Sequence, residues 1–457
     1  MTSFRGRKVA VIGAARTGVA VARALVPLGA IVHVFDDKAE EDLPGAAEAL
    51  RAAGASVTWG ASDGPQLLAA DIVVPSPGVW KTSPVLVAAA DRGQTIWSEP
   101  EVAFRITAAP MVAVTGTNGK TTTTALIGRM LQDAGRDARV GGNIAPGIPL
   151  VEQAASAPAS AILAAEISSF QLEWIDAFRP VVGVITNIAA DHLNRHGSVD
   201  EYAAMKARLL ENQTAADSAI VNADSARAVA AGKIGRGLVW HFSRRREVAR
   251  GAFMRGHEIV LRDGGGETTI MDARNVRIPG LHNRENALAA VIAGRILGLS
   301  TDNIVFTLST FAGVEHRMED AGAVRGVRYI NNSMCTNPAA LAASIEALET
   351  RILVIVGGRD KALDFGPVEA AFRVGAKAVF SIGEHGPALA ALARKAGVET
   401  VVESGDLATA VADAARTARE GDIVMLAPGC ASMDQFQDFM DRGNQFKAAV
   451  KEMMEAA

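Results

Sequence analysis

The chain has 457 residues, a formal net charge of -4 and only two cysteines, Cys335 and Cys430. At roughly 150 residues per domain, this length predicts about three domains. The near-balanced charge argues against a broad nucleic-acid-binding surface, and two cysteines exclude a disulfide framework and favour a reducing compartment. The sequence contains no signal-peptide core and no run of about 18 apolar residues, so we expect a cytoplasmic protein without membrane insertion.

Short runs rich in valine and isoleucine alternate with longer stretches rich in alanine and leucine. Such alternation is typical of βα units built around mostly parallel sheets. The first run leads into a turn at Gly13, the second ends at Asp36, and a later one leads into the Ser-Pro-Gly turn at 76–78. We therefore expect a Rossmann-like domain over residues 1–108. Its predicted strands are Val9–Ile12, Ile31–Phe35 and Asp71–Val74.

A central domain is expected over residues 109–313. After a break near Pro110, an apolar run leads into a glycine-rich loop that begins at Gly116, and a later helix-forming run is closed by Gly298. The stretch between residues 238 and 261 departs from the alternation and indicates short antiparallel strands. These features predict an α/β domain of the phosphate-loop ATPase type. The other predicted elements are the strands Met111–Thr115, Ala161–Ala165 and Val181–Thr186 and the helix Leu281–Leu297.

A second break near Gly313 begins the last part of the chain, residues 314–457, where the alternation resumes. We expect another open, Rossmann-like α/β sheet there, which makes the chain a three-domain α/β protein. The predicted strands are Arg328–Ile330, Arg351–Val356, Ala378–Ile382 and Asp422–Ala427.

The glycine loop lies between a predicted strand and a helix-like run, as a phosphate-binding loop requires. Backbone N–H groups of such a loop approach phosphates, and Lys120 and Thr121 would serve the β/γ-phosphates and Mg²⁺. Val114 stands where the common motif has a glycine, so the alternative is a turn that binds nothing. The candidate nucleotide-binding residues of the loop are Gly116, Thr117, Asn118, Gly119, Lys120, Thr121 and Thr122.

Three further side chains are candidates for metal binding and catalysis. Glu166 ends a predicted strand, at the edge where open α/β sheets bind ligands, and His192 follows the next strand after a short loop. Mg²⁺ beside phosphates requires oxygen ligands, which Glu166 can supply. Taken alone, each of these residues is more often a surface or capping group. By its spacing, Lys206 would be an ordinary exposed lysine of a helix.

Four strings of residues resemble the Mur ligase family. They are T-G-T-N-G-K-T-T at 115–122, E-I-S-S-F-Q-L-E at 166–173, N-I-A-A-D-H-L-N-R-H at 187–196 and G-L-H-N-R-E-N-A at 280–287. The resemblance implies that Glu166 and His192 bind Mg²⁺ and that Lys206 is carbamylated and supports a second Mg²⁺. It also implies nucleotide contacts from three residues, with helix capping as the alternative for the first. They are Asn283, Asn286 and Arg317.

Other segments resemble those of family members that add D-glutamate. They are S-P-G at 76–78, G-G-N-I at 141–144, G-G-R-D-K at 357–361 and A-P-G-C-A-S-M-D-Q-F at 427–436. The resemblance implies that the first domain holds the UDP end of one substrate and that the last domain holds the amino acid, so the site would form between domains. The residues implied for substrate are Thr17, Asp36, Ser76, Gly78, Asn143, Ser168, Thr336, Lys361, Ser432 and Phe436.

The implied activity is ATP-dependent addition of D-glutamate to UDP-N-acetylmuramoyl-L-alanine, through an acyl phosphate, in peptidoglycan precursor synthesis. We expect these small molecules as partners, no nucleic acid, and a monomer. The segment N-N-S-M-C-T-N at 331–337 departs from the family, because Asn332 replaces an aspartate and Met334 replaces a lysine that pairs with a glutamate carboxylate. L-Glutamate or another amino acid is therefore an alternative substrate.

Three other functions remain open at this point. The phosphate-loop string also resembles the folylpolyglutamate synthases, although the Rossmann-like first domain argues against them. A non-catalytic nucleotide-binding protein would not need Glu166, His192 and Lys206 together. A dehydrogenase is disfavoured, because the turn at 13–18 lacks the middle glycine of the dinucleotide-binding motif.

Overall fold

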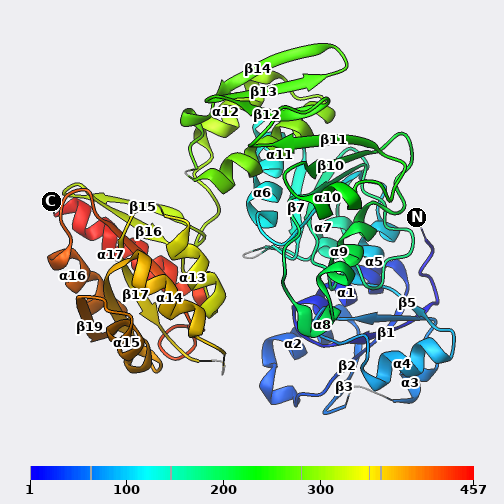
Figure 1. Cartoon of the computed structure of the whole chain (residues 1–457). Coiled ribbons are helices and arrows are strands. Elements are labelled where there is room, and N and C mark those ends of the chain that lie inside the picture. Colours follow the sequence, from blue (N-terminus) through cyan, green and yellow to red (C-terminus); the bar gives the residue numbers. More distant parts are fainter. Residues whose placement is uncertain are drawn as a thin grey trace. The chain divides into compact units, whose positions relative to one another are not determined.

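The computed structural model describes residues 2–61, 64–144, 147–278, 280–348, 350–360 and 363–456. Their backbone forms three sheets, each with helices packed against it (Figure 1). The chain divides into two compact units, Met1–Phe311 and Ala312–Ala457. Two of the sheets belong to the first unit and one to the second. The prediction of a three-domain α/β chain is confirmed.

The first domain is a five-stranded parallel sheet. Its elements are β1 (Lys8–Ile12), α1 (Arg16–Leu25), β2 (Ile31–Asp36), α2 (Pro44–Ala53), β3 (Ser56–Trp59), α3 (Pro65–Leu68), β4 (Ile72–Pro75), α4 (Pro84–Asp91), β5 (Thr95–Ile96) and α5 (Glu99–Ile106). The order β3-β2-β1-β4-β5 reverses at β1, and open α/β sheets bind ligands beyond the carboxyl ends of strands at such a point. The apolar pattern does not predict β3, because none of its side chains is fully buried.

The central domain contains a nine-stranded sheet. Its elements are β6 (Met111–Thr115), α6 (Lys120–Asp133), β7 (Ala138–Gly142), α7 (Leu150–Ala155), β8 (Ile162–Glu166), β9 (Val182–Ile185), α8 (Leu193–His196), α9 (Val199–Ala207), β10 (Ser218–Asn222), α10 (Ala226–Ala231), β11 (Leu238–Ser243), β12 (Gly251–Arg255), β13 (Glu258–Asp263), β14 (Gly266–Asp272), α11 (Leu281–Ile296) and α12 (Thr301–Thr310). The strand order is β14-β13-β12-β11-β10-β9-β6-β8-β7, so β6 lies between β9 and β8.

The prediction of antiparallel strands between residues 238 and 261 is wrong for β11, which runs parallel to both β10 and β12. Parallel neighbours require the chain to run back from the end of one strand to the start of the next. Strands β11 and β12 pair over only three residues, so the loop between them has only a short distance to cover. The antiparallel prediction is confirmed for β12 and β13, and β14, which lies beyond the predicted stretch, is antiparallel to β13 as well, because tight turns join the three strands. The sheet therefore carries an antiparallel edge on a parallel centre.

One buried cluster extends through the first and central domains. Side chains of β1 such as Val11 and side chains of β6 such as Met111 and Ala113 belong to it, and the intervening side chain Val112 packs into a cluster on the opposite face. A sheet covered on both faces has strands that are apolar throughout, which is why these strands are predictable. The shared core explains why the two domains form one compact unit.

The last domain is a six-stranded sheet with helices on both faces. Its elements are β15 (Glu319–Val324), β16 (Val327–Asn331), α13 (Pro338–Glu346), β17 (Ile352–Gly357), α14 (Gly366–Gly375), β18 (Ala376–Ile382), α15 (Gly386–Lys395), β19 (Thr400–Gly405), α16 (Leu407–Thr417), β20 (Ile423–Gly429) and α17 (Phe439–Glu455). The order is β15-β16-β20-β17-β18-β19, and only β15 is antiparallel to its neighbour. The edge strands β15 and β19 are not predicted, because their side chains are half buried or exposed.

Across the described ranges, no helix has both the length and the apolar character needed to cross a lipid bilayer.

Candidate functional site

The phosphate loop connects β6 to α6, as predicted. Gly116 and Gly119 both have positive φ angles, of 146° and 83°. A Cβ atom at Gly116 would collide with the hydroxyl of Thr186, and one at Gly119 would collide with the side chain of Asn286. Only glycine fits these two positions, because neighbouring segments pack directly against the loop backbone.

Contacts from the end of β9 hold the phosphate loop. The Thr186 hydroxyl donates to the carbonyl of Asn118 at 2.6 Å, and Asn118 N–H donates to the side chain of Asn187 at 3.0 Å. The ammonium of Lys120 donates to the carbonyls of Gly116 and Thr117 at 3.0 and 2.9 Å. Its charge is therefore held over the loop, where a nucleotide's phosphates would lie. Thr122 lies half buried on the same helical turn.

The buried carboxylate of Glu166 is held between the phosphate helix and the β7–α7 loop. The hydroxyl of Thr121 donates to Glu166 Oε2 at 2.7 Å, and the side-chain amide of Asn143 donates to Oε1 at 2.9 Å. Strands β6 and β8 are neighbours, so their carboxyl ends bring residues 121 and 166 together. Two predicted metal-ligand residues and one predicted substrate residue are thus in direct contact.

Lys206 is buried, with 1% of its surface exposed, so the expectation from spacing of an exposed lysine is wrong. Its Nζ lies 4.5 Å from the centre of the Tyr202 ring. Burial lowers the pKa of Lys206 well below its usual value; the charge of Lys120 lowers it further, and Asp191 and Glu166 oppose the shift. A lysine of lowered pKa is present in part as the neutral amine, which is the form that reacts with CO₂ to give a carbamate.

His192 directly precedes α8 and has a left-handed backbone (φ 51°), and about half of its side chain is exposed. Partial burial lowers the pKa of His192, Asp191 opposes the shift, and the cations Lys206, Lys120 and Arg195 add to it. The neutral imidazole that results is the form that binds metals. Among the described residues, no three His, Cys, Asp or Glu side chains are gathered so that they could hold an ion by themselves.

The two asparagines of α11 link this helix to the phosphate helix. The Thr123 hydroxyl donates to Asn286 Oδ1 at 3.2 Å, and Asn286 Nδ2 donates to Asn283 Oδ1 at 3.1 Å. Both amides are buried. The capping residue of α11 is Gly280, so the alternative of Asn283 as a helix cap is wrong. Tertiary packing against α6 accounts for the position of these amides.

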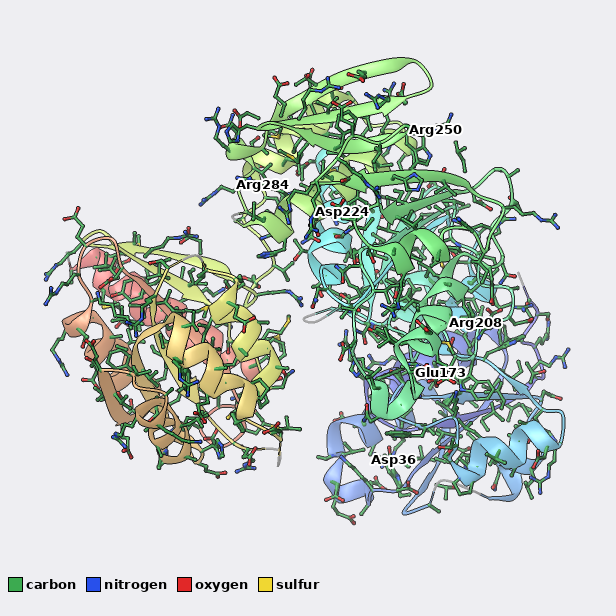
Figure 2. All side chains as sticks on the ribbon, viewed as in Figure 1. Asp36, Glu173, Arg208, Asp224, Arg250 and Arg284 are labelled. Carbon is green, nitrogen blue, oxygen red and sulfur yellow. The ribbon has the colours of Figure 1, made fainter. Side chains whose placement is uncertain are left out.

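The candidate substrate residues of the first domain lie at the carboxyl edge of its sheet. Asp36, labelled in Figure 2, accepts hydrogen bonds from the backbone N–H of Ala14 at 2.7 Å and of Lys38 at 2.9 Å. Ser76 follows β4 and approaches the Gly13 carbonyl at 3.5 Å. Thr17 lies half buried on α1, and Gly78 is exposed after β4. All four predicted residues therefore lie at the carboxyl ends of the strands of this sheet, where its strand order reverses.

A narrow crevice lies where the first domain meets the central domain. Its walls come from both domains and are formed by Pro75, Ser76, Pro77, Val79, Ser98, Glu99, Phe170, Gln171, Trp174 and Arg195. Ser168 borders this region, since its hydroxyl and N–H both donate to Gln171 Oε1. Within the described part of the chain, the buried hydroxyl of Ser98 has no hydrogen-bond partner.

Sequence reasoning missed two buried ionisable side chains at this crevice. Burial raises the pKa of Glu99 to about 7, although Val151 N–H donates to its carboxyl at 2.6 Å. The side chain of Arg195 is 5% exposed, and its guanidinium pairs with Glu173. Glu173 and Arg195 stand within the strings that resemble the family, but nothing in their spacing indicates that they pair.

In the last domain, Thr336 and Ser432 lie in loops that follow the neighbouring strands β16 and β20. Arg442, which is fully buried, joins these loops by donating to the carbonyls of Ser333 and Cys430. Phe436 is half buried beyond Ser432. The predicted residue Lys361 lies outside the described residues.

The two departures from the family pattern have defined surroundings. Asn332 donates to the Ser344 hydroxyl at 2.7 Å and accepts from Met318 N–H at 3.1 Å. The sulfur of Met334 lies 3.9 Å from a guanidinium nitrogen of Arg317. Asn332 is thus held by internal bonds, and position 334 adjoins the arginine implied for nucleotide binding.

Cys335 and Cys430 are buried, unpaired thiols. Burial raises the pKa of Cys335 to about 11 and that of Cys430 to about 12. Thiols with such high pKa values are not nucleophiles at neutral pH, because the thiolate is the reactive form.

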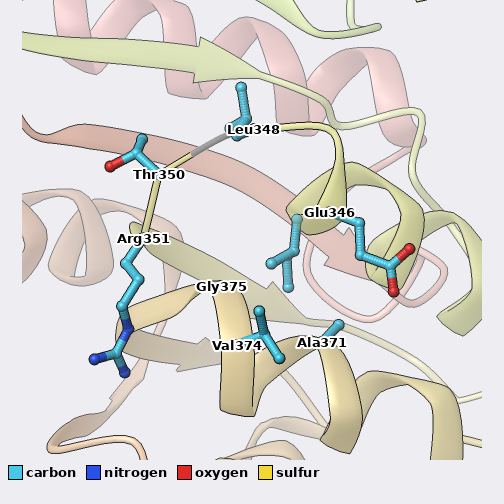
Figure 3. A pocket seen from close by; sticks show the side chains of 8 residues that line it. Glu346, Leu348, Thr350, Arg351, Ala371, Val374 and Gly375 are labelled. Atoms are coloured by element: carbon cyan, nitrogen blue, oxygen red, sulfur yellow. The ribbon is translucent and has the colours of Figure 1, made fainter.

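A hollow in the last domain lies apart from the candidate substrate residues Thr336 and Ser432 (Figure 3). It is lined by Ile345, Glu346, Leu348, Thr350, Arg351, Ala371, Val374 and Gly375. Thr350 and Arg351 precede β17, whereas Thr336 and Ser432 follow the carboxyl ends of β16 and β20. The hollow therefore lies at the other edge of the sheet.

Three family models match the chain in the same order as its sheets. Residues 7–98 match "Mur ligase MurD-like, N-terminal domain", residues 114–294 match "Mur ligase middle domain", and residues 316–430 match "Mur ligase, glutamate ligase domain". The chain belongs to the Mur ligase family. Mur ligases are ATP-dependent enzymes that form amide bonds, so the protein is a ligase.

Similar proteins agree with membership of the Mur ligases. A UDP-N-acetylmuramoylalanine–D-glutamate ligase from Pelotomaculum thermopropionicum is 42% identical over 98% of both chains, and one from Desulfitobacterium hafniense is 39% identical over 97% of both. The structure of a UDP-N-acetylmuramate–alanine ligase from Thermotoga maritima superposes with a TM-score of 0.59 at 18% identity, covering 98% of this chain and 100% of that one. At that identity, the structural likeness concerns the Mur ligase fold alone.

Proposed function

We propose that the protein adds D-glutamate to UDP-N-acetylmuramoyl-L-alanine, with ATP, through an acyl phosphate. The observation that carries this proposal is the position of Glu166. Its carboxylate contacts Thr121 of the phosphate helix on one side and Asn143, an expected substrate residue, on the other. Relatives at 42% and 39% identity over nearly the whole chain bear the name of this activity.

The residues at the phosphate loop suit Mg²⁺. Thr121 offers a hydroxyl oxygen, Glu166 offers carboxylate oxygens, and His192 offers an imidazole whose lowered pKa favours the neutral form. Lys206 is proposed to be carbamylated, which would turn a buried cation into an oxygen donor for a second Mg²⁺. When bound, Mg²⁺ would offset negative charge on the phosphates during transfer.

The chain's own groups then position the reactants. Lys120 holds its ammonium against the loop carbonyls, where it would stabilise charge on the γ-phosphate as the substrate carboxylate attacks. Asn283, Asn286 and Arg317 are proposed to contact the nucleotide. The amine of the amino acid then attacks the acyl phosphate, and phosphate leaves. Such catalysis depends mainly on positioning and electrostatics.

Substrate binding is divided among the domains in this proposal. Thr17, Asp36, Ser76 and Gly78 of the first domain, with Asn143 and Ser168, would bind the UDP-muramoyl substrate. Thr336, Lys361, Ser432 and Phe436 would bind D-glutamate. We also propose domain limits of 1–108, 109–313 and 314–457, a cytoplasmic location and a monomeric state.

The experiment that tests the function is phosphate release by the purified protein with Mg-ATP and UDP-N-acetylmuramoyl-L-alanine. D-Glutamate, L-glutamate and a panel of other amino acids are supplied in parallel. We expect turnover with D-glutamate only. Turnover with a different amino acid would overturn the specificity while leaving the ligase chemistry in place, and no turnover with any amino acid would overturn the substrate assignment.

A further inference from the structure

Arg195 lies at the junction between the first and central domains, and nearly all of its side chain is buried. Its Nε and Nη2 atoms donate to the two carboxylate oxygens of Glu173 at 2.8 and 2.6 Å. Figure 2 shows Glu173 in the part of the central domain next to the first domain. This pairing compensates the buried charge and leaves the outer N–H groups free to bond elsewhere.

Those outer groups hold a loop of the first domain. Nη1 donates to the carbonyl of Pro77 at 3.0 Å, and Nη2 donates to the carbonyl of Val79 at 2.9 Å. These carbonyls belong to the Ser-Pro-Gly loop, residues 76–79, which the proposed function assigns to the UDP-muramoyl substrate. Gly78, between them, is exposed, and a Cβ added there would meet no atom within 4 Å. The loop is thus fixed from one side, while open space remains at Gly78.

An aromatic ring fixes the orientation of the guanidinium. The Phe170 ring centre lies 4.3 Å from Arg195 Cζ, so the cation rests on the ring. Phe170 in turn stacks on His196, whose Nε2 lies 3.0 Å from the Ser169 hydroxyl. The planar fork of an arginine can serve a carboxylate, two carbonyls and a ring together, whereas the ammonium of a lysine is a compact point donor.

We propose that Arg195 is a positioning residue that holds the Ser-Pro-Gly loop on the central domain in the form that binds the UDP-muramoyl substrate. The inference rests on the proposed function for the identity of that substrate. The bonds from Arg195 to the loop are available only in the folded arrangement of the two domains, because 118 residues separate Arg195 from Pro77.

Two substitutions at Arg195 and one matched control test this role. Arg195→Met keeps length but removes every donor, and Arg195→Lys keeps the charge. The control is Arg208→Met, because Arg208 donates to the carbonyls of Leu172 and Glu173 in the same segment but makes no described bond to the first domain. Figure 2 shows Arg208 close to Glu173.

We expect Arg195→Met to raise the KM for UDP-N-acetylmuramoyl-L-alanine by about tenfold or more, since small displacements of positioning groups have effects of this size. The KM of Arg195→Met for D-glutamate should stay within about twofold of the wild-type value. For UDP-N-acetylmuramoyl-L-alanine, the KM of Arg195→Lys should lie between those of the wild type and Arg195→Met. Arg208→Met should leave both KM values unchanged. An unchanged KM in Arg195→Met, or equal changes in Arg195→Met and Arg208→Met, would overturn the inference.

A second measurement needs no substrate. Val79 N–H donates to the Ser76 carbonyl at 2.9 Å, so its hydrogen exchange reports on the loop. Exchange in the intact, substrate-free protein should be faster in Arg195→Met and unchanged in Arg208→Met. If the wild type shows no ligase turnover but exchange follows this pattern, the proposed function fails and the positioning of the loop stands. Wild-type exchange in Arg195→Met would overturn the inference whatever the ligase assay shows.

Discussion

The hydroxyl of Thr121 donates a 2.7 Å hydrogen bond to the carboxylate of Glu166, across 45 residues of sequence. The two residues meet because β6 and β8 are adjacent parallel strands whose carboxyl ends lie at one edge of the sheet. The contact places an acidic oxygen beside the phosphate loop and orients it from the first turn of α6. It is the relationship on which the proposed metal site depends.

Glu166→Gln should lower kcat by about 100-fold or more while the protein remains folded. The amide preserves the shape of the side chain but lacks the negative charge, and a preorganised electrostatic contact contributes about 10²–10³ in rate. Phosphate release under saturating substrates measures the effect. Glu152→Gln provides the control, because Glu152 is a partly exposed residue of α7 in the same domain. Wild-type kcat in Glu166→Gln would contradict the role of Glu166.

Lys206 should carry a carbamate. Its burial and lowered pKa favour the neutral amine that reacts with CO₂. Incubation with ¹³C-bicarbonate should give a carbamate carbonyl signal in the ¹³C NMR spectrum of the wild type. The signal should be absent from Lys206→Met and present in Lys233→Met, since Lys233 is an exposed lysine of the same domain. A wild-type spectrum without that signal would show that Lys206 is unmodified.

Glu99 should make stability depend on pH. Burial raises the pKa of its carboxyl from 4.5 to about 7, so the folded protein binds a proton that the unfolded chain releases. Protonation of Glu99 contributes roughly 3 kcal/mol to the free energy of unfolding. This contribution is complete below about pH 4.5 and is lost as pH rises through about 7. We therefore expect the free energy of unfolding of the wild type, relative to that of Glu99→Gln, to fall over this range.

Denaturant unfolding of both proteins at several pH values measures this difference. Other titrating groups contribute equally to the two proteins, so they cancel. Glu48→Gln should show no such trend, because Glu48 is exposed on α2. A constant difference between wild type and Glu99→Gln would mean that the Glu99 carboxyl is ionised throughout.

Met334→Lys should lower the KM for D-glutamate by roughly tenfold. A charge-assisted hydrogen bond contributes about 1.5–3 kcal/mol, and repulsion from Arg317, which lies beside Met334, offsets part of it. Initial rates at varied D-glutamate measure the change, with Met454→Lys on α17 as an exposed control. A higher KM in Met334→Lys would contradict the prediction, because it would mean that repulsion between Arg317 and the new ammonium outweighs pairing with the D-glutamate carboxylate.

Local chemistry made much of the candidate site predictable. Gly116, Gly119, Lys120 and Thr121 follow a strand and lead into a helix, and this local order alone predicts a phosphate-binding loop. The side chains of Thr186 and Asn286, which leave room only for glycine at 116 and 119, come from distant segments. Central strands such as β6 and β17 are predictable because both faces of their sheets are buried. The edge strand β19 is not, because its half-exposed side chains lack that pattern.

The sequence by itself determined the order of the three α/β domains and the residues that surround a phosphate loop, since both depend on contiguous strings. Tertiary structure alone decided that Lys206 is buried, that Asn283 pairs with Asn286 instead of capping a helix, and that Arg195 reaches Pro77 and Val79. The physical reason is that burial and pairing are set by segments far apart in the chain, and no local pattern records which of them will pack together.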